Sequence, residues 1–518
     1  MDMIMNKWKF ALPLIIAAVT LSCESLEDTY KDYAGDGKVR YVGKCSNATL
    51  EEGWRRFVLN WENSADATIT NILITWDEGD GSVLLDADAT SYTTDATFEN
   101  RPYDFVIQAV DHDGNKSLPI SLNGRPFTHE HDLIRGFSKA VSKHFFVGGK
   151  LVLFLDSYNE NLTSAKLTYF SGGLPQSLEL TKEIFDGKYK VVDDVDRNGE
   201  VFVERTANIA DCIDKVIFDP HPLKSENYAV LNMDFRQQVI ESLALTEIND
   251  ALLSSQETIY IDYSLNSLED ILYFTNLKKV VLGGMRYMND TSLANLAPLS
   301  TLQNTETSLF ALNFMHDVLG VEVEIYNNHF DIFSELSFAT DKGNPVLPKL
   351  TYLDNTGWTI ENLTYPASSN PDVYPYNEGF PYAEAPAKLF DNNPATRWEP
   401  YFDMYSDPAA FRTHELLIDM QQVETVSGFR ITQTTQVPAN AWSAPILRSD
   451  FITVLISTDG KAWEQAHSQA YRDIGPGIGE STIIKLPATK NIQYVKLVIT
   501  DVQYTYLFKT SLGDFMVF

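Results

Sequence analysis

Strand patterns divided by turn residues limit most strongly how this chain can fold. Residues 56–61 and 68–76 run or alternate apolar with many β-branched side chains, and residues 77–81 supply aspartate and glycine for a turn. This pattern predicts a β-sandwich over residues 37–124. With 518 residues the chain is too long for a single hydrophobic core, so we expect three or four domains.

A second strand-rich unit is predicted over residues 125–228. Residues 150–155, 165–169 and 201–205 have strand patterns separated by Gly, Asn and Asp. The hairpin over residues 103–116 resembles the last hairpin of a fibronectin type III domain. The two units together resemble the tandem fibronectin-like region of many Bacteroidetes lipoproteins, which implies two fibronectin/Ig-like β-sandwiches.

Three polar segments in these units imitate metal sites. Residues 111–115 hold two aspartates but no downstream carboxylate, and residues 194–199 resemble the start of an EF-hand loop whose twelfth position is Arg205 instead of Glu. Both are predicted to be turns. His129 and His131 have workable spacing for a metal on a strand, but without a third ligand we favour a polar linker.

The pattern changes to helical spacing and short strands over residues 229–345. Residues 235–243 have the spacing of an amphipathic helix, and residues 258–282 resemble a leucine-rich repeat of strand, turn and helix. The expected asparagine ladder is missing. A small leucine-rich-repeat-like α/β block and an irregular α/β domain therefore both remain open, and the block either binds a partner or acts as a spacer.

Three motifs near the C-terminus point to one family. Residues 389–398 read LFDNNPATRW, residues 456–463 read ISTDGKAW, and the chain ends in SLGDFMVF at residues 511–518. In this order they resemble a factor V/VIII type C (discoidin) domain, covering residues 350–518. The resemblance implies a jelly-roll β-sandwich that binds a ligand. Trp398 and Trp463 occupy framework positions and are expected in the core, and Trp358 is expected to help open the sandwich. The fold class is thus mainly β and multidomain.

The resemblance extends to family 32 carbohydrate-binding modules, which often hold a calcium ion. Carried over by position, Asp391, Asn393 and Thr396 would supply oxygens, Lys388 a carbonyl, and Asp514 the place of the closing Glu. Asn392 departs from the usual glycine, and Asp514 is one methylene shorter. A structural Ca²⁺ and a hydrogen-bonded polar turn remain the two alternatives.

In such modules, loops at one end of the sandwich recognise the ligand with aromatic and polar side chains. The candidate ligand-binding residues are Trp442, Tyr401, Tyr405, Tyr504 and Arg448. Each has a structural alternative. The aromatic rings could fill the core, and Arg448 could simply precede the next strand.

The N-terminus predicts export. Lys7 and Lys9 precede a short apolar run, which is typical of a signal peptide over residues 1–22. The run ends at Cys23 in a sequence similar to a bacterial lipobox, so Cys23 is the predicted lipidation site, with an ordinary signal followed by a buried cysteine as the alternative. The acidic residues of the acylated linker at 23–36 resemble a surface-export tag or form a solvated linker. We expect a lipid-anchored protein of the outer membrane, exposed at the cell surface, that touches the membrane only through its anchor.

Composition narrows the function. The net charge of −31 disfavours nucleic acid and anionic lipid surfaces, and only Cys45 and Cys212 remain after Cys23, so no disulfide framework is expected. No serine elbow, Walker loop, zinc signature or region of (β/α) barrel size is present, and we expect no enzyme. We expect a surface lipoprotein that binds a glycan or polysaccharide, working beside an outer-membrane transporter complex in polysaccharide uptake. The alternative is an adhesion or assembly protein with a protein partner.

Overall fold

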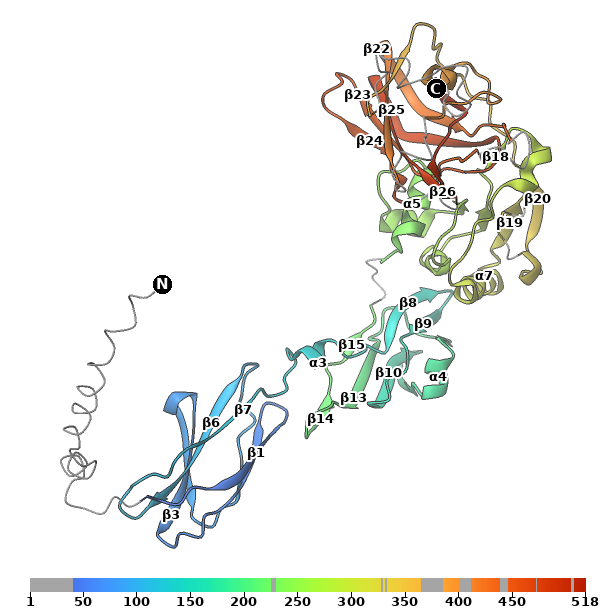
Figure 1. Ribbon diagram of the computed structural model, residues 1–518. Coiled ribbons are helices and arrows are strands. Elements are labelled where there is room, and N and C mark those ends of the chain that lie inside the picture. Colours follow the sequence, from blue (N-terminus) through green and yellow to red (C-terminus); the bar gives the residue numbers. More distant parts are fainter. Residues whose placement is uncertain are drawn as a thin grey trace, which may run out of the picture.

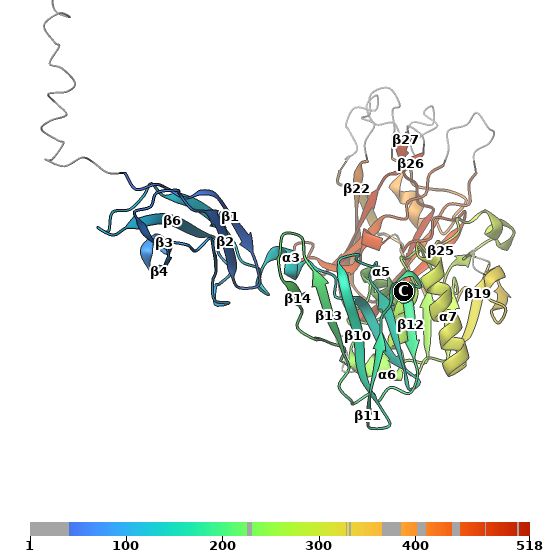
Figure 2. The same ribbon diagram turned by 90° about the horizontal axis from the view of Figure 1, so that it is seen from below.

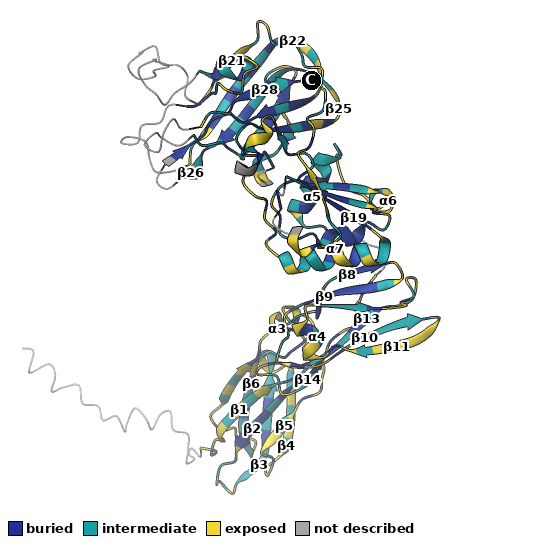
Figure 3. Cartoon of the chain, turned by 90° about the vertical axis from the view of Figure 1, so that its right-hand side faces the viewer, coloured by how far each residue is buried: buried dark blue, intermediate teal, exposed yellow. Residues whose placement is uncertain are grey.

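The computed structural model describes residues 41–224, 230–327, 329–330, 333–364, 385–400, 411–437, 446–471, 473–504 and 507–518. The units follow one another along an elongated molecule, with the N-terminal sandwich at one end and the C-terminal unit at the other (Figures 1 and 3). Among the described residues, no helix has both the length and the apolar character needed to cross a membrane. The described cysteines, Cys45 and Cys212, are both unpaired; Cys45 is buried, whereas Cys212 is only partly so.

The first unit is the predicted β-sandwich. One sheet has the strand order β1-β2-β5 and the other β4-β3-β6-β7, and all the pairs are antiparallel. Every second residue of β6 is buried, which is the period of a strand with one face on a core. The strands are β1 (Ser46–Glu52), β2 (Phe57–Glu62), β3 (Ile69–Trp76), β4 (Gly81–Asp86), β5 (Ser91–Thr93), β6 (Tyr103–Asp111) and β7 (Ile120–Gly124).

The second unit also has two antiparallel sheets, ordered β12-β9-β8 and β11-β10-β13-β14, with β15 beside β13. Strand β9 is buried at every residue after Lys150 because it packs on both faces. Its Leu151 and Leu153 face the second sheet, whereas Val152 and Phe154 lie in the core of the next unit. A continuous apolar run is the pattern of such a strand. The elements are α3 (Asp132–Arg135), β8 (Val141–Val147), β9 (Lys150–Leu155), β10 (Leu162–Ser171), β11 (Leu174–Glu179), α4 (Lys182–Asp186), β12 (Tyr189–Val192), β13 (Phe202–Asn208), β14 (Lys215–Ile217) and β15 (His221–Pro222).

The third unit is an α/β block around a parallel sheet ordered β16-β17-β19-β20. Along this sheet the strands keep the order that they have in the sequence, as they do in stacked repeats. The helix predicted over residues 235–243 is α5. The elements are α5 (Met233–Ser242), α6 (Asp250–Ser255), β16 (Thr258–Ile261), β17 (Lys279–Leu282), β18 (Tyr287–Met288), α7 (Thr305–Leu319), β19 (Glu322–Tyr326) and β20 (Thr340–Gly343).

The C-terminal unit is built on two long strands, β22 and β25. Their register shifts between Asp419 and Glu424 and again before Gly428, so each strand contributes to two parts of the sandwich. Residues from both halves of β22, such as Ile418 and Phe429, share one core with Trp398. The strands are β21 (Thr359–Asn362), β22 (Thr413–Thr432), β23 (Ile452–Ser457), β24 (Glu464–His467), β25 (Glu480–Thr500), β26 (Val502–Tyr504), β27 (Leu507–Lys509) and β28 (Asp514–Val517).

The tryptophans of this unit only partly follow the sequence analysis. Trp398 is fully buried, as expected for a framework residue. Trp358 lies at the edge of the same core, with its ring edge-on to Phe390. The prediction that Trp463 lies in the core is wrong. It is partly exposed beyond the end of β23, with the ammonium group of Lys496 over its ring at 4.8 Å, because the β23–β24 turn lifts it out of the sandwich.

The α/β block and the C-terminal unit share a sheet and a buried interface. Tyr287 of β18 pairs with Ser481 of β25, so the block adds a strand to the C-terminal sheet. Beside this strand, the guanidinium of Arg286 contacts the carboxylate of Glu480, and both side chains are almost completely buried. The boundary predicted near residue 350 therefore separates the two units along the sequence, but the units pack against each other in the structure.

Candidate functional site

The strands that flank the predicted ligand-binding loops begin or end at one end of the C-terminal sandwich. Thr413 at the start of β22 pairs with Thr500 at the end of β25, and Ile452 at the start of β23 pairs with Ile499. The segments before β22, before β23 and after β25 must therefore leave the sheet side by side. The described ends of these three segments therefore lie at one end of the sandwich, which we call the rim.

Buried ion pairs hold the base of this rim. The carboxylate of Asp501 accepts from Nε of Arg412 at 2.8 Å and contacts Nε2 of His414 at 2.9 Å, and the side chains of Asp501 and His414 are fully buried. Burial disfavours the charge of Asp501, but the contacts with His414 and Arg412 outweigh burial and hold its pKa below the usual value. This group joins the start of β22 to the end of β25.

A second buried ion pair lies at the base of the segment before β22. Glu399 and Lys509 form an ion pair whose side chains are 1% and 3% exposed, and Nε of Arg397 lies 2.5 Å from the same carboxylate. The pair ties the first loop to strand β27. Sequence analysis missed Glu399, Lys509, Arg412 and Asp501. The sequence does not show whether a charged residue beside an apolar strand is solvated or forms a buried ion pair.

Arg448 lies at the base of the second loop and donates to backbone carbonyls. Its guanidinium bonds to the carbonyl oxygens of Thr434, at 3.0 Å, and of Gln436. Burial, helped by the charge of Arg397, lowers the pKa of Arg448 to about 10. These contacts match the structural alternative for Arg448, and a direct ligand contact stays a prediction.

The other predicted binding residues lie outside the described residues. Trp442, Tyr401 and Tyr405 belong to undescribed segments, and of Tyr504 only the backbone in β26 is described. The predicted lipidation site Cys23 and the predicted signal peptide also lie outside the described residues. Figure 2 shows β26 and β27 at the end of the unit where the rim lies.

The predicted calcium residues do come together. Lys388 lies in the turn of helix at Pro386–Phe390, and Asp391, Asn393 and Thr396 follow it. Oδ1 of Asp391 accepts from the amide of Asn393 at 3.0 Å, and Oδ2 accepts from Oγ1 of Thr396 at 2.8 Å. The ammonium group of Lys388 is 3.9 Å from Oδ2 of Asp391. The loop is thus ordered by its own hydrogen bonds, as the polar-turn alternative requires.

Asp514 favours the calcium alternative. Its side chain is buried at the start of β28, and Oδ1 has no hydrogen-bond partner among the described residues. Burial and the negative charge of Asp391 raise its pKa to about 6, although Arg430 opposes the shift. Two carboxylates and nearby neutral oxygens are the donors that a hard cation needs.

Asn392, where the family usually has glycine, has φ = +54°. Asparagine tolerates this left-handed conformation better than most residues, so the departure does not disrupt the loop.

The two predicted histidines of the linker do not form a metal site. Nδ1 of His129 lies 3.3 Å from Asp219, whereas the side chain of His131 accepts from the amide of Leu133 at the start of α3. Asp111 binds the amides of Asp113 and Asn115 within its own turn. The turn and linker interpretations of these segments are therefore supported.

Comparison with known proteins identifies the C-terminal unit. The profile of the F5/8 type C domain family matches residues 365–509, and that of DUF4998, a domain of unknown function, matches residues 23–141. No curated protein matches the chain. The predicted discoidin-like domain is confirmed. The fibronectin type III, leucine-rich-repeat and lipoprotein assignments stay predictions.

Several solved structures resemble about a third of the chain. A fragment of a putative chitobiase from Bacteroides thetaiotaomicron is 24% identical and covers 33% of this chain and 93% of its own, with a TM-score of 0.24. Chitosan-binding module 1 from a chitosanase/glucanase of Paenibacillus sp. IK-5 is 15% identical and covers 32% and 95%, with a TM-score of 0.20. CBM32-1 from a family 31 glycoside hydrolase of Clostridium perfringens is 18% identical and covers 32% and 95%, with a TM-score of 0.21.

Proposed function

We propose that this chain is a non-catalytic lipoprotein of the cell surface that binds carbohydrate through the rim of its C-terminal domain. The F5/8 type C profile over residues 365–509 is the observation that carries the proposal. The rim supports it, because buried ion pairs at the loop bases give the loops a rigid frame, and rigid frames lower the entropy lost on binding.

Recognition is proposed to rest on aromatic rings in these loops. Trp442, Tyr401, Tyr405 and Tyr504 present flat faces of the kind that stack on sugar rings, and polar groups beside them pair with hydroxyls. The net charge of −31 favours neutral or basic sugars over acidic ones.

We also propose a structural Ca²⁺ at Asp391, Asn393, Thr396 and Asp514, with the carbonyl oxygen of Lys388. The orphaned oxygen of Asp514 supports it. The ion would join the loop after residue 390 to strand β28 without touching the ligand. Its role is therefore to hold the sandwich together.

The N-terminal sequence supports the proposed location. Lipidation at Cys23 would anchor the chain to the outer membrane, and the elongated arrangement of the first three units would hold the rim away from it (Figure 1). A role beside a transporter in polysaccharide uptake is part of this proposal.

Affinity electrophoresis of the chain without its signal peptide tests the binding. We expect a polysaccharide in the gel to retard the parent chain, and we expect Trp442→Ala to raise the apparent Kd at least about tenfold. Trp463→Ala is the matched control, since Trp463 lies beyond the opposite end of β23 from the rim. Its retardation should be unchanged.

Two outcomes would contradict the proposal. Release of product from a saccharide by the pure chain would show an enzyme. No retardation by any glycan, together with capture of a protein partner, would favour the adhesion or assembly function.

A further inference from the structure

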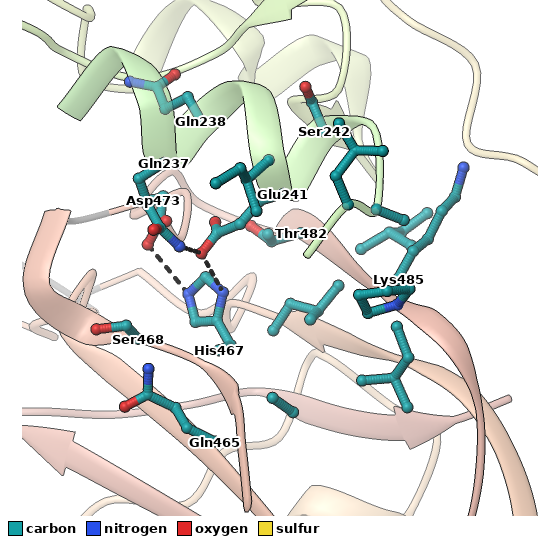
Figure 4. A pocket seen from close by; sticks show the side chains of 18 of the residues that line it. Gln237, Gln238, Glu241, Ser242, Gln465, His467, Ser468, Asp473, Thr482 and Lys485 are labelled. Carbon is teal, nitrogen blue, oxygen red and sulfur yellow. Dashed lines mark hydrogen bonds and ion pairs between the residues drawn. The ribbon is translucent and has the colours of Figure 1, made fainter. Parts of the chain in front are cut away.

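A cavity of about 350 Å³ lies between helix α5 and the C-terminal sheet. Its walls come from α5 and the turn after it, from β24 and from the first residues of β25 (Figure 4). The cavity therefore exists only because the α/β block packs on the C-terminal unit. It is distinct from the rim and from the proposed calcium loop.

Three side chains converge at one wall of this cavity. Oε1 of Glu241, on α5, is 3.3 Å from Nδ1 of His467, and Oδ1 of Asp473 is 3.0 Å from Nε2 of the same ring. One donor atom from each residue lies within 4.8 Å of the other two. His467 and Asp473 are each 2% exposed, whereas Glu241 is 23% exposed and faces the cavity (Figure 4).

The buried atoms of this cluster lack satisfactory partners. Both ring nitrogens of His467 and both carboxylate oxygens of Asp473 make no hydrogen bond of acceptable geometry within the part of the chain that the structure describes. Their contacts are ion pairs within the cluster instead. Buried polar groups are nearly always satisfied in native proteins, so four such atoms at one point call for a missing partner.

We propose that Glu241, His467 and Asp473 bind a divalent transition-metal ion, with Zn²⁺ as the best fit. One imidazole and two carboxylates are typical zinc donors, and three protein ligands leave one coordination position open. Ca²⁺ would need six or more oxygens, which this cluster does not offer.

The surroundings suit such an ion. The side-chain amide of Gln237 donates to Oε1 of Glu241 and thereby orients that carboxylate. The open position faces a cavity large enough for water or a small ligand. Because Glu241 belongs to the α/β block and His467 and Asp473 to the C-terminal unit, the ion would join the two units.

Zinc binding by the full chain without its signal peptide tests the proposal. After treatment with a chelator and its removal, titration calorimetry with Zn²⁺ should detect one site per chain. Glu241→Gln and Asp473→Asn should each weaken it at least about tenfold, because loss of even an outer-shell partner costs about 10- to 100-fold in metal affinity. Glu464→Gln is the matched control, because Glu464 lines the same cavity but pairs with Lys490 outside the cluster. It should bind Zn²⁺ as the parent does.

A second readout separates this site from others. Zn²⁺ should raise the melting midpoint of the parent and of Asp391→Asn, which alters the calcium loop, but not that of Asp473→Asn. Glu241→Gln changes a partly exposed side chain and should fold. It therefore tests the zinc site even if Asp473→Asn fails to fold. Unchanged zinc affinity in Glu241→Gln, or no zinc binding by the parent, would overturn the proposal and leave an imidazolium ion between two carboxylates.

Discussion

The buried ion pair between Arg286 and Glu480 should hold the α/β block against the C-terminal sheet. Nε and Nη2 of Arg286 donate to the two carboxylate oxygens at 2.6 and 2.9 Å, and the two side chains are 1% and 0% exposed. Arg286 also donates to the carbonyl oxygen of Pro298 at 2.9 Å. Apart from Arg286, Glu480 accepts only from the amide of Gly477, at 2.8 Å, among the described side-chain contacts.

Arg286→Met removes the charge but keeps much of the volume. It leaves the carboxylate of Glu480 buried with one hydrogen bond, and loss of one partner of a buried pair costs about 3 to 5 kcal/mol. We expect that loss in the free energy of unfolding of the body formed by the two units. Lys490→Met is the control, because its pair with Glu464 is exposed and should contribute less than about 1 kcal/mol.

Urea unfolding together with hydrogen exchange measures the effect. Amides of β18, which is held on β25 beside the ion pair, should lose protection in Arg286→Met before the rest of the C-terminal core. The double variant Arg286→Met/Glu480→Leu should recover most of the loss, since an apolar pair replaces the stranded charge. A cost below about 1 kcal/mol for Arg286→Met, or a double variant as unstable as the single one, would refute this reasoning.

Two further predictions concern pH and calcium. Burial raises the pKa of Asp262 to about 7, although the amide of Met285 and the charge of Arg286 oppose the shift. The folded pKa lies above the unfolded value near 4, so this carboxyl does not weaken the fold at about pH 4, and its cost grows as the pH rises to about 7, reaching at most roughly 4 kcal/mol. Asp262→Asn should therefore stabilise the chain against urea at about pH 8 and not at about pH 4; an equal effect at both would contradict the assignment. For calcium, chelation should lower the melting midpoint of the full chain and added Ca²⁺ should restore it, whereas Asp391→Asn should show neither change. If the melting midpoint of the parent does not respond to either treatment, the proposed calcium site is contradicted.

Local patterns were sufficient to predict much of the fold. The alternation over residues 68–76 predicted β3, and the helical spacing over residues 235–243 predicted α5, because both signals depend only on neighbours in sequence. The motif around Trp398 located a core residue of the C-terminal domain. The same kind of local reading was wrong for Trp463, since a family position does not report how far one turn lifts its side chain.

The residues of the proposed calcium loop could be picked out in the sequence for a different reason. Asp391, Asn393 and Thr396 lie within six residues of one another, and the family resemblance supplied Asp514 from a distant strand. The zinc cluster had no such signal. Glu241, His467 and Asp473 do not follow any ligand spacing that is typical of a zinc site. His467 lies two residues after Gln465 in an ordinary polar strand, where nothing in the sequence marks it as a metal ligand.

From sequence alone, the chain's β-rich, multidomain character and its discoidin-like C-terminal domain could be determined; the ligand-binding loops stay a prediction. Those features arise from short-range periodicity and from motifs that are each continuous in the sequence. The tertiary structure decided which charges are buried and which units share a core: Arg286 meets Glu480, and Val152 of β9 packs under the α/β block. The physical reason is that burial of a charge or of a second strand face depends on what covers it, and the covering segment lies far away along the chain.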